Sequence, residues 1–237
     1  MSNSRRIVYE TLEVYDEISR GYSSWRSRAW EIANVVRGGV ILDLGSGHCV
    51  NGLQAALKRS VDYLICVDIA PSMLLEAREL AERKKFSKVD FVAADATTIP
   101  LRGLAVDSII SIALMHHLPS EELHKTFAEI ARTLKPGGLA LATSWSKRQL
   151  RFVAQTFIIY LAKLLNIPGL HNYRVKWRTR RKVYTRRYFL YEVSDLEKVA
   201  RKTGLRVISK GYVKQFNSLN SYVVAAKVGS RFEEVFY

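Results

Sequence analysis

The chain has 237 residues, of which 48% are hydrophobic and 25% charged. This is enough for one α/β domain with an appended segment, and it excludes global disorder. The formal charge of +15 is unevenly distributed, because residues 145–237 contain 20 Lys/Arg and 5 Asp/Glu while residues 1–144 are balanced. This asymmetry predicts a neutral catalytic part followed by a part that meets a polyanion.

The cysteines and the apolar segments limit the cellular setting. Cys49 and Cys66 have neither a CxxC partner nor ligand-spaced histidines, so we expect both to be reduced, with no disulfide and no metal site. The N-terminus lacks the apolar stretch of a signal peptide. The longest apolar run, residues 152–165, is too short to span a bilayer. We therefore expect a soluble cytoplasmic protein without a membrane partner.

Apolar runs of strand length alternate with helical patterns over most of the chain. Two amphipathic helices around Gly21 are expected within residues 9–37. Strands follow at 38–47, 63–69, 88–95, 106–117 and 139–145, with helices between them. Short, continuous apolar strands separated by helices indicate a parallel sheet covered on both faces. The predicted fold is α/β, with a doubly wound, mostly parallel seven-stranded sheet that two late strands complete.

Two turn signals and an insertion are expected in the second half of the chain. Ser120 could cap the helix after the fourth strand, and Pro136-Gly137-Gly138 should stop the chain before the fifth. A helical segment (147–166) and a basic segment precede a helix near 194–203 and the late strands. We divide the chain into N-terminal helices covering the active site (1–37), a ligand-binding core (38–146), a helical and basic insertion (147–193), a C-terminal completion of the sheet (194–229) and a tail (230–237).

Acids and glycines stand at the ends of three successive strands. Gly45 and Gly47 allow a tight turn and close approach of a ligand where doubly wound sheets bind them. A dinucleotide fingerprint would need glycine at position 50, which is Val50, so NAD is disfavoured. Asp68 can accept both hydroxyls of a ribose, and Asp95 can lie near an adenine amino group. The set suits a nucleoside without phosphates.

This arrangement resembles the class I S-adenosylmethionine-dependent methyltransferases over about residues 38–145. The resemblance implies a Rossmann-like fold with S-adenosylmethionine as cofactor. It implies that the glycine loop backs the methionine part, that Asp68 holds the ribose and that Asp95 and Ala96 flank the adenine. Cys49 departs from the superfamily, which usually has a third glycine there. The implied cofactor-binding residues are Asp43, Gly45, Ser46, Gly47, Asp68, Ile69, Met73, Asp95, Ala96 and Ala113.

Three further blocks are similar to the tRNA wobble-uridine carboxymethyl methyltransferases. They are YDEISRGYSSWRSRAW (15–30), DSIISIALMHHLPS (107–120) and TRRYFLYEVSDLEKV (185–199). The family's arginine four residues before a tryptophan falls on Arg26, and its histidine pair on His116 and His117. The resemblance implies methyl esterification of a 5-carboxymethyl-type uridine in the anticodon loop. Arg26 would orient the carboxylate, and one of the histidines would contact the base or the carboxylate.

The basic segment holds eight Lys/Arg between positions 174 and 187, with aromatic residues among them. Such a mixture suits an anticodon loop, because arginines bind phosphates while aromatic rings stack on unpaired bases. Alternating charges from Arg174 to Arg180 have the period of a strand and would lie on one face. The expected RNA-binding residues are Arg174, Lys176, Trp177, Arg178, Arg180, Arg181, Lys182, Arg186 and Arg187.

Besides tRNA, the family resemblance implies a small zinc-binding activator protein, and the apolar run 88–94 could be the edge strand that it joins. Two other functions stay open. Residues 152–170 with the basic segment could form an interfacial helix, in which case the enzyme would methylate a membrane-associated small molecule. The chain could also be a non-catalytic RNA-binding subunit with a relic cofactor fold, although the intact acids argue against this.

Overall fold

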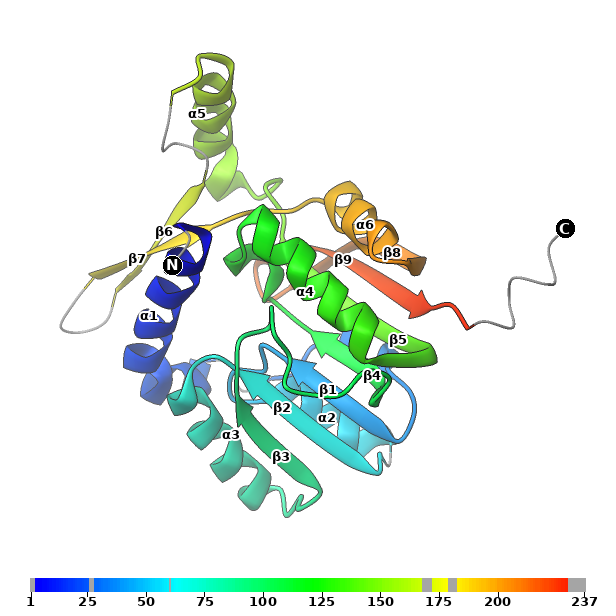
Figure 1. Ribbon diagram of the computed structural model, residues 1–237. Helices are drawn as coiled ribbons and strands as arrows, with labels where there is room; N and C mark the ends of the chain where they lie inside the picture. Colours follow the sequence, from blue (N-terminus) through cyan, green and yellow to red (C-terminus); the bar gives the residue numbers. More distant parts are fainter. Residues whose placement is uncertain (1–2, 26–27, 60, 168–171, 179–182, 230–237) are drawn as a thin grey trace, which may run out of the picture.

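The computed structural model describes residues 3–25, 28–59, 61–167, 172–178 and 183–229, and a seven-stranded sheet forms its centre (Figure 1). The strand order is β3-β2-β1-β4-β5-β9-β8, parallel except for β9, which is antiparallel to both of its neighbours. The predicted fold class is confirmed. The strands are β1 (Val40–Leu44), β2 (Tyr63–Asp68), β3 (Val89–Ala93), β4 (Val106–Ser111), β5 (Leu134–Trp145), β8 (Leu205–Gln215) and β9 (Ser218–Lys227).

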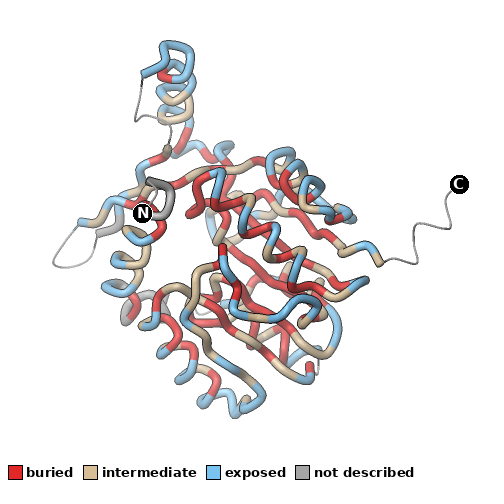
Figure 2. Tube along the Cα trace, viewed as in Figure 1, coloured by how far each residue is buried: buried red, intermediate tan, exposed pale blue. Residues whose placement is uncertain are grey.

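Helices cover both faces of the sheet, and each face has its own apolar core. Side chains alternate along β1, so that Leu42 and Leu44 belong to one core and Ile41 to the other. The first core includes α4 (Ser120–Thr133) and α6 (Val193–Lys202); the second includes the 3₁₀ helix η1 (Glu31–Val35), α2 (Val50–Arg59) and α3 (Pro71–Arg83). Figure 2 shows the buried strands between these layers. Ligands of such sheets bind at the carboxyl ends of the parallel strands.

The N-terminal segment forms one long helix, α1 (Asn3–Trp25), which runs through Gly21. The prediction of two helices separated near Gly21 is wrong, because a single glycine costs a helix only about 1 kcal/mol and does not have to end it. Leu12 and Tyr15 of α1 pack against Ala70 and Met73, where α3 begins. This contact holds α1 beside the carboxyl ends of β1 and β2.

The insertion after β5 carries a helix and a two-stranded ribbon that both lie beyond the sheet (Figure 1). It consists of the 3₁₀ helix η3 (Leu150–Phe152), α5 (Val153–Leu164), β6 (Tyr173–Arg178) and β7 (Val183–Tyr188). An aromatic cluster joins it to the sheet: Trp145, Phe152, Tyr173 and Tyr188 pack with Leu190. The inner face of α5 is fastened to β6, because Gln155 exchanges hydrogen bonds with the backbone of Arg174 and Thr156 Oγ1 lies 3.0 Å from Tyr173 Oη.

Two local predictions are wrong. Ser120 makes no side-chain cap, because the N-cap position of α4 is Pro119. Pro136, Gly137 and Gly138 do not precede the fifth strand but lie within β5, whose pairing with β4 shifts register between Val106 and Ser108. The proline is tolerated there because an irregular pairing does not require its missing N–H group. No helix among the described residues is long and apolar enough to cross a bilayer.

Glu192 connects the insertion with the end of the sheet. Its buried carboxylate accepts hydrogen bonds from Ser146 Oγ and from the backbone N–H of Lys147, both at 2.9 Å. It also accepts one from Tyr212 Oη at 2.7 Å, and Arg148 Nε lies 3.2 Å away. In addition, Glu192 and Asp195 form a capping box at the start of α6. One side chain therefore joins β5, the insertion, α6 and β8.

We predict that Glu192→Ala lowers the free energy of unfolding by about 3 kcal/mol, because several buried donors lose their acceptor. Urea denaturation measures this. Glu79→Ala is the matched control: Glu79 forms an exposed pair with Arg83, and its loss should cost less than about 0.5 kcal/mol. Equal effects of the two substitutions would contradict the role given to Glu192.

Candidate functional site

A tight loop between β1 and α2 forms the floor of the site. Its backbone is fixed by β2, because the N–H groups of Gly45 and Ser46 both donate to the carbonyl of Val67, at 2.8 and 3.0 Å. Gly45 has a φ of +68°, and a Cβ there would lie 2.8 Å from Leu114 Cδ1. Glycine at this position therefore provides both the left-handed backbone and the close approach to the segment after β4.

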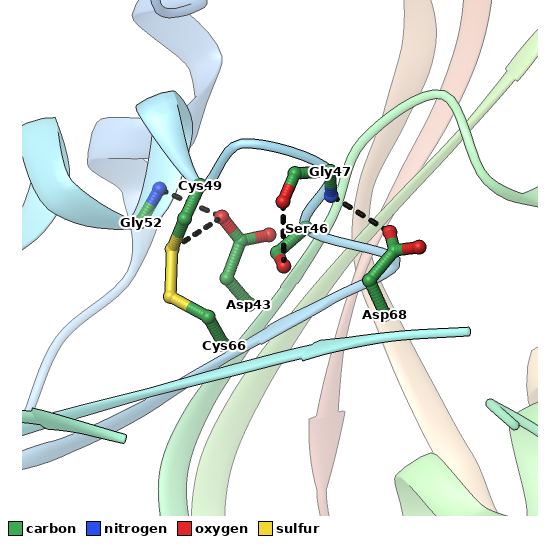
Figure 3. Close-up of a disulfide and its surroundings, with 7 residues drawn as sticks. All are labelled: Asp43, Ser46, Gly47, Cys49, Gly52, Cys66 and Asp68. Carbon is green, nitrogen blue, oxygen red and sulfur yellow. Dashed lines mark hydrogen bonds between the residues drawn. A yellow bond between two sulfur atoms is a disulfide. The ribbon is translucent and has the colours of Figure 1, made fainter. Parts of the chain in front are cut away.

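A disulfide joins this loop to the neighbouring strand, since Cys49 is bonded to Cys66 of β2 (Figure 3). The prediction of two reduced cysteines is wrong. Sequence spacing missed the pair because only the parallel pairing of β1 with β2 brings Cys66 level with Asp43 and under the loop. Cys49 has a φ of +56°, which is the left-handed backbone conformation that favours glycine. Its side chain is fully buried and points to Cys66 (Figure 3).

Asp43 lies beneath the loop rather than in the cavity above it. Its Oδ2 accepts the backbone N–H of Gly52 at 2.8 Å and lies 3.6 Å from Cys49 Sγ, which as part of a disulfide has no proton to donate (Figure 3). Burial raises the pKa of Asp43 from 3.8 to about 7, while the hydrogen bond from Gly52 opposes that shift. Asp43 thus supports the loop from below and is absent from the cavity lining.

The main cavity opens above the loop at the carboxyl ends of β1, β2 and β4. At its side stands Asp68, whose Oδ2 accepts the N–H of Gly47 at 2.7 Å and whose Oδ1 accepts the N–H of Ala70 at 2.9 Å. Burial raises the pKa of Asp68, and these backbone bonds oppose the shift. Nine of the ten residues implied as cofactor-binding line the cavity: Gly45, Ser46, Gly47, Asp68, Ile69, Met73, Asp95, Ala96 and Ala113.

This lining fits S-adenosylmethionine. Each oxygen of Asp68 uses one lone pair for a backbone N–H, Oδ2 for that of Gly47 and Oδ1 for that of Ala70, and keeps another for a ribose hydroxyl. Ile69 and Met73 offer apolar contact to a ring. Asp95 accepts the N–H and the hydroxyl of Thr97, both through Oδ1, which leaves Oδ2 to face an amino group. Among the described residues no group of three His, Cys, Asp or Glu side chains could hold a metal ion.

A hydrogen-bonded series of side chains forms the wall opposite the loop. Arg186 Nη1 donates to Tyr15 Oη at 2.9 Å, and Tyr15 Oη lies 3.2 Å from His117 Nε2. Because the phenol oxygen accepts from Arg186, its own proton can go to His117. Tyr15 and His117 both line the cavity. Arg186 is 5% exposed, so it belongs to this wall and not, as predicted, to the phosphate-binding cations.

The histidine pair does not lie on the fourth strand. β4 ends at Ser111, and His116 and His117 lie on the 3₁₀ helix η2 (Met115–His117) that follows it. The extended apolar run misled the strand prediction, because a buried 3₁₀ turn is equally apolar. His117 faces the cavity, whereas His116 stacks on Trp145 at 4.9 Å between ring centroids and is not a lining residue.

The segment after α1 contributes lining residues that sequence reasoning missed. Arg28 and Trp30 line the cavity, and the backbone N–H of Trp30 donates to Asn51 Oδ1 at 2.9 Å. Arg26, the expected carboxylate-binding residue, lies outside the described residues. The signal was present, because Tyr15, Arg28 and Trp30 all stand in the first family-like block, but helical periodicity alone could not indicate which of them face inward.

The basic segment forms a ribbon over the part that the structure describes. Arg174 and Lys176 of β6 are exposed, while Tyr173 and Val175 pack inward, so the predicted alternation is present there. Arg187 of β7 pairs with Glu10 of α1 at 3.2 Å. Trp177 and Arg178 lie in β6, but their side chains are outside the described set, as are Arg180, Arg181 and Lys182 entirely.

Comparison with known proteins finds methyltransferases among the proteins that this chain resembles. A methyltransferase domain family matches residues 41–138. A tRNA (carboxymethyluridine(34)-5-O)-methyltransferase of Arabidopsis thaliana is 33% identical over 57% of this chain and 32% of its own length. An arsenite methyltransferase of Halobacterium salinarum is 28% identical over 58% of this chain and 35% of its own. The chain spans between a fifth and a third of the length of the first tRNA-modifying relatives that it matches.

Solved structures share the fold. The putative methyltransferase in a Haloferax volcanii complex with the Trm112 methyltransferase activator superposes with a TM-score of 0.69 at 15% identity, covering 92% of this chain and 97% of its own. A Burkholderia thailandensis 1,6-didemethyltoxoflavin-N1-methyltransferase with bound S-adenosylhomocysteine gives 0.68 at 16% identity, covering 97% and 92%. These structures share the fold predicted for this chain, and residues 41–138 match the methyltransferase domain family.

The buried Asp43 should make stability fall as the pH rises. Its folded pKa of about 7 exceeds the ordinary 3.8, so the unfolded chain ionises first and is favoured progressively between about pH 4 and 7. The loss is up to about 4 kcal/mol. Asp43→Asn keeps an acceptor for Gly52 and should remove this slope in urea denaturation at several pH values. Asp90→Asn, at an exposed position on β3, should retain it; a full slope in Asp43→Asn would refute the assignment.

Proposed function

We propose that this class I S-adenosylmethionine-dependent methyltransferase esterifies the carboxylate of a 5-carboxymethyl-type uridine at the wobble position of a tRNA anticodon. The observation that carries the proposal is the wall made by Arg186, Tyr15 and His117, with Arg28 beside it in the same cavity. This wall offers hydrogen-bond donors and positive charge to an anionic acceptor. Support for the RNA comes from the tRNA-modifying relatives and from the cationic ribbon at the rim.

The chemistry asks little of the protein besides orientation. S-adenosylmethionine supplies an electrophilic methyl group on a sulfonium. A carboxylate oxygen of the acceptor forms the new C–O bond as the C–S bond breaks, which gives a methyl ester and a neutral thioether with no proton transferred. A carboxylic acid has an ordinary pKa near 4, so at neutral pH the acceptor is already ionised and needs no general base. Alignment of the reacting atoms alone can supply about 7–11 kcal/mol.

Arg28 and the residues of the wall have different parts in that alignment. Arg28 lines the cavity and would orient the carboxylate through a charge-assisted hydrogen bond. His117, held by Tyr15, would contact the uracil edge or the oxygen that does not attack. Arg186 acts through Tyr15 and is a positioning residue. Too close a pairing of both oxygens would lower nucleophilicity, so we assign a single cation, Arg28, to the acceptor.

The ribbon would bind the phosphates of the anticodon loop. Arg174 and Lys176 form an exposed cationic row on β6, and β7 of the same ribbon supplies Arg186 to the wall. A loop bound along this row would thus be carried to the cavity. Extruding the wobble base costs a few kcal/mol, and phosphate contacts would offset that cost.

We also propose an activator protein as a partner, joined at β3. β3 is an edge of the sheet, and Phe91 and Val92 are only half-buried there. An unpaired edge can accept a strand from another chain. The structural relative from Haloferax volcanii was solved in a complex with its Trm112 activator.

The outer face of α5 favours a second candidate, methylation of a membrane-associated small molecule. Phe157, Tyr160 and Leu164 are 63%, 64% and 67% exposed, and Leu150 just before the helix is 91% exposed. The helix is thus apolar outside and tied to the ribbon inside, beside exposed lysines and arginines. Such a face fits an interface with anionic lipid.

One labelling experiment tests both candidates. The purified protein with radiolabelled S-adenosylmethionine, bulk tRNA and a lipid extract should transfer label to tRNA, and nucleoside mass spectrometry should identify a methyl ester that alkali removes. Label in the lipid fraction alone would reject the tRNA proposal in favour of the second candidate. Absence of transfer to either substrate, both without and with the co-expressed activator, would indicate the non-catalytic subunit.

Arg28→Gln should lower kcat/KM for a stem-loop carrying 5-carboxymethyluridine by about 10–100-fold, because a charged hydrogen bond is worth about 1.5–3 kcal/mol. The affinity for S-adenosylmethionine, measured by calorimetry, should change little. Arg26→Gln is the matched control. If it caused the larger loss, the carboxylate would be oriented by Arg26 as the family resemblance implies, and the assignment to Arg28 would fall.

Co-expression with the host's small zinc-binding activator should give a 1:1 complex that co-purifies, and the chain alone should be much less active or less soluble. Size-exclusion chromatography with light scattering measures the stoichiometry. Full activity of the isolated chain, with no complex formed, would contradict the proposal of an activator partner.

A further inference from the structure

A second cavity lies next to the main one. It has a volume of about 340 Å³, and Trp30 lines both cavities. Trp145 at the end of β5 forms part of it, together with residues 215–218, which make the turn between β8 and β9. Trp145 pairs with Asn220 across β5 and β9, so this turn lies at the same carboxyl edge of the sheet as the main cavity. The volume is within the range of small-molecule sites.

The lining combines aromatic surface with hydrogen-bond donors. Phe216 is 49% exposed and has a φ of +46°, a conformation that bulky residues rarely adopt and that is often kept at functional sites. Trp145 is 7% exposed, and its indole N–H is buried and has no hydrogen-bond partner among the described residues. This nitrogen has almost no accessible surface, so Trp145 contributes ring surface to the cavity lining and not a free donor.

Arg151 supplies the hydrogen-bond donors. Its guanidinium lies 4.3 Å from the centre of the Trp145 ring, and its hydrogen bonds to Gln149 and Ser218 both use Nη2. A guanidinium has five N–H donors, so others remain for a ligand. A guanidinium with free N–H groups beside aromatic rings favours a ligand with carbonyl oxygens. A planar ring with carbonyl acceptors on its edge, stacked on Phe216, has the matching chemistry.

We propose that this second cavity binds the base of the nucleotide next to the acceptor uridine, through its carbonyl edge and by stacking on Phe216. The inference rests on the proposed function. The carboxymethyl arm is only two carbons long, so the ring that carries it has to stay in the main cavity with the methyl donor. Since Trp30 lies between the two cavities, the neighbouring nucleotide can reach the second one.

The test is a double-mutant cycle in which one change is made in the protein and the other in the RNA. The stem-loop with 5-carboxymethyluridine is prepared intact and with an abasic site on either side of that nucleotide. Phe216→Ala should raise KM about 10-fold on the intact RNA, as expected for the loss of one base–aromatic stack. One of the abasic RNAs should show the same rise with the wild-type protein and no further rise with Phe216→Ala, because both changes remove one contact.

Two controls separate this contact from a general defect. With free 5-carboxymethyluridine nucleoside, Phe216→Ala should have the activity of wild type, since the nucleoside has no neighbour. Phe157→Ala removes another exposed aromatic, on α5, and should leave KM for the RNA unchanged. Equal loss on nucleoside and RNA, or additive losses with both abasic RNAs, would overturn the proposal.

The result also separates this proposal from the function on which it rests. If wild type methylates none of these substrates, the proposed function fails. The same cycle is then measured as Kd by fluorescence anisotropy with labelled stem-loops. Coupling between Phe216 and one neighbouring base would support the base-binding cavity. Absence of this coupling would reject the proposal.

Discussion

Two carboxylates on neighbouring parallel strands determine the shape of the loop on which the site is built. Asp43 of β1 holds Gly52 from below, and Asp68 at the end of β2 holds Gly47 from the side. The Cys49–Cys66 disulfide adds a covalent link between the loop and β2. Three attachments within ten residues explain how a loop with left-handed residues at Gly45, Gly47 and Cys49 keeps one conformation. The cofactor side of the cavity is therefore preorganised by the sheet itself.

The acceptor side is assembled differently, from segments far apart in the chain. Tyr15 comes from α1, His117 from the turn after β4, and Arg186 from the inserted ribbon, so the wall is complete only when all three elements are docked. The aromatic cluster around Tyr188 and Trp145 brings the ribbon to this position, and His116 is part of the same packing. Docking of the ribbon and completion of this wall therefore depend on the same contacts.

The core and the cofactor loop could be predicted from the sequence because their signals are local. Continuous apolar runs mark buried parallel strands, and Gly45 and Gly47 follow the first of them directly. The wall could not be predicted in this way. Arg186 stands in a run of cations and differs from its neighbours only by where β7 turns its side chain, and the bond to Tyr15 spans 171 positions. The disulfide could not be predicted for the same reason, because strand pairing and not sequence spacing brings its cysteines together.

The insertion presents two surfaces side by side whose contacts respond to salt in opposite directions. Added electrolyte weakens contacts between exposed cations, such as those of β6, and phosphates, because the entropy gained by releasing counterions falls as the salt concentration rises. Salts excluded from protein surfaces, such as sulfate, strengthen apolar association, and the bare outer face of α5 is the surface that they would act on. A high concentration of sulfate therefore weakens anion contacts on β6 and strengthens apolar contacts on α5 at the same time.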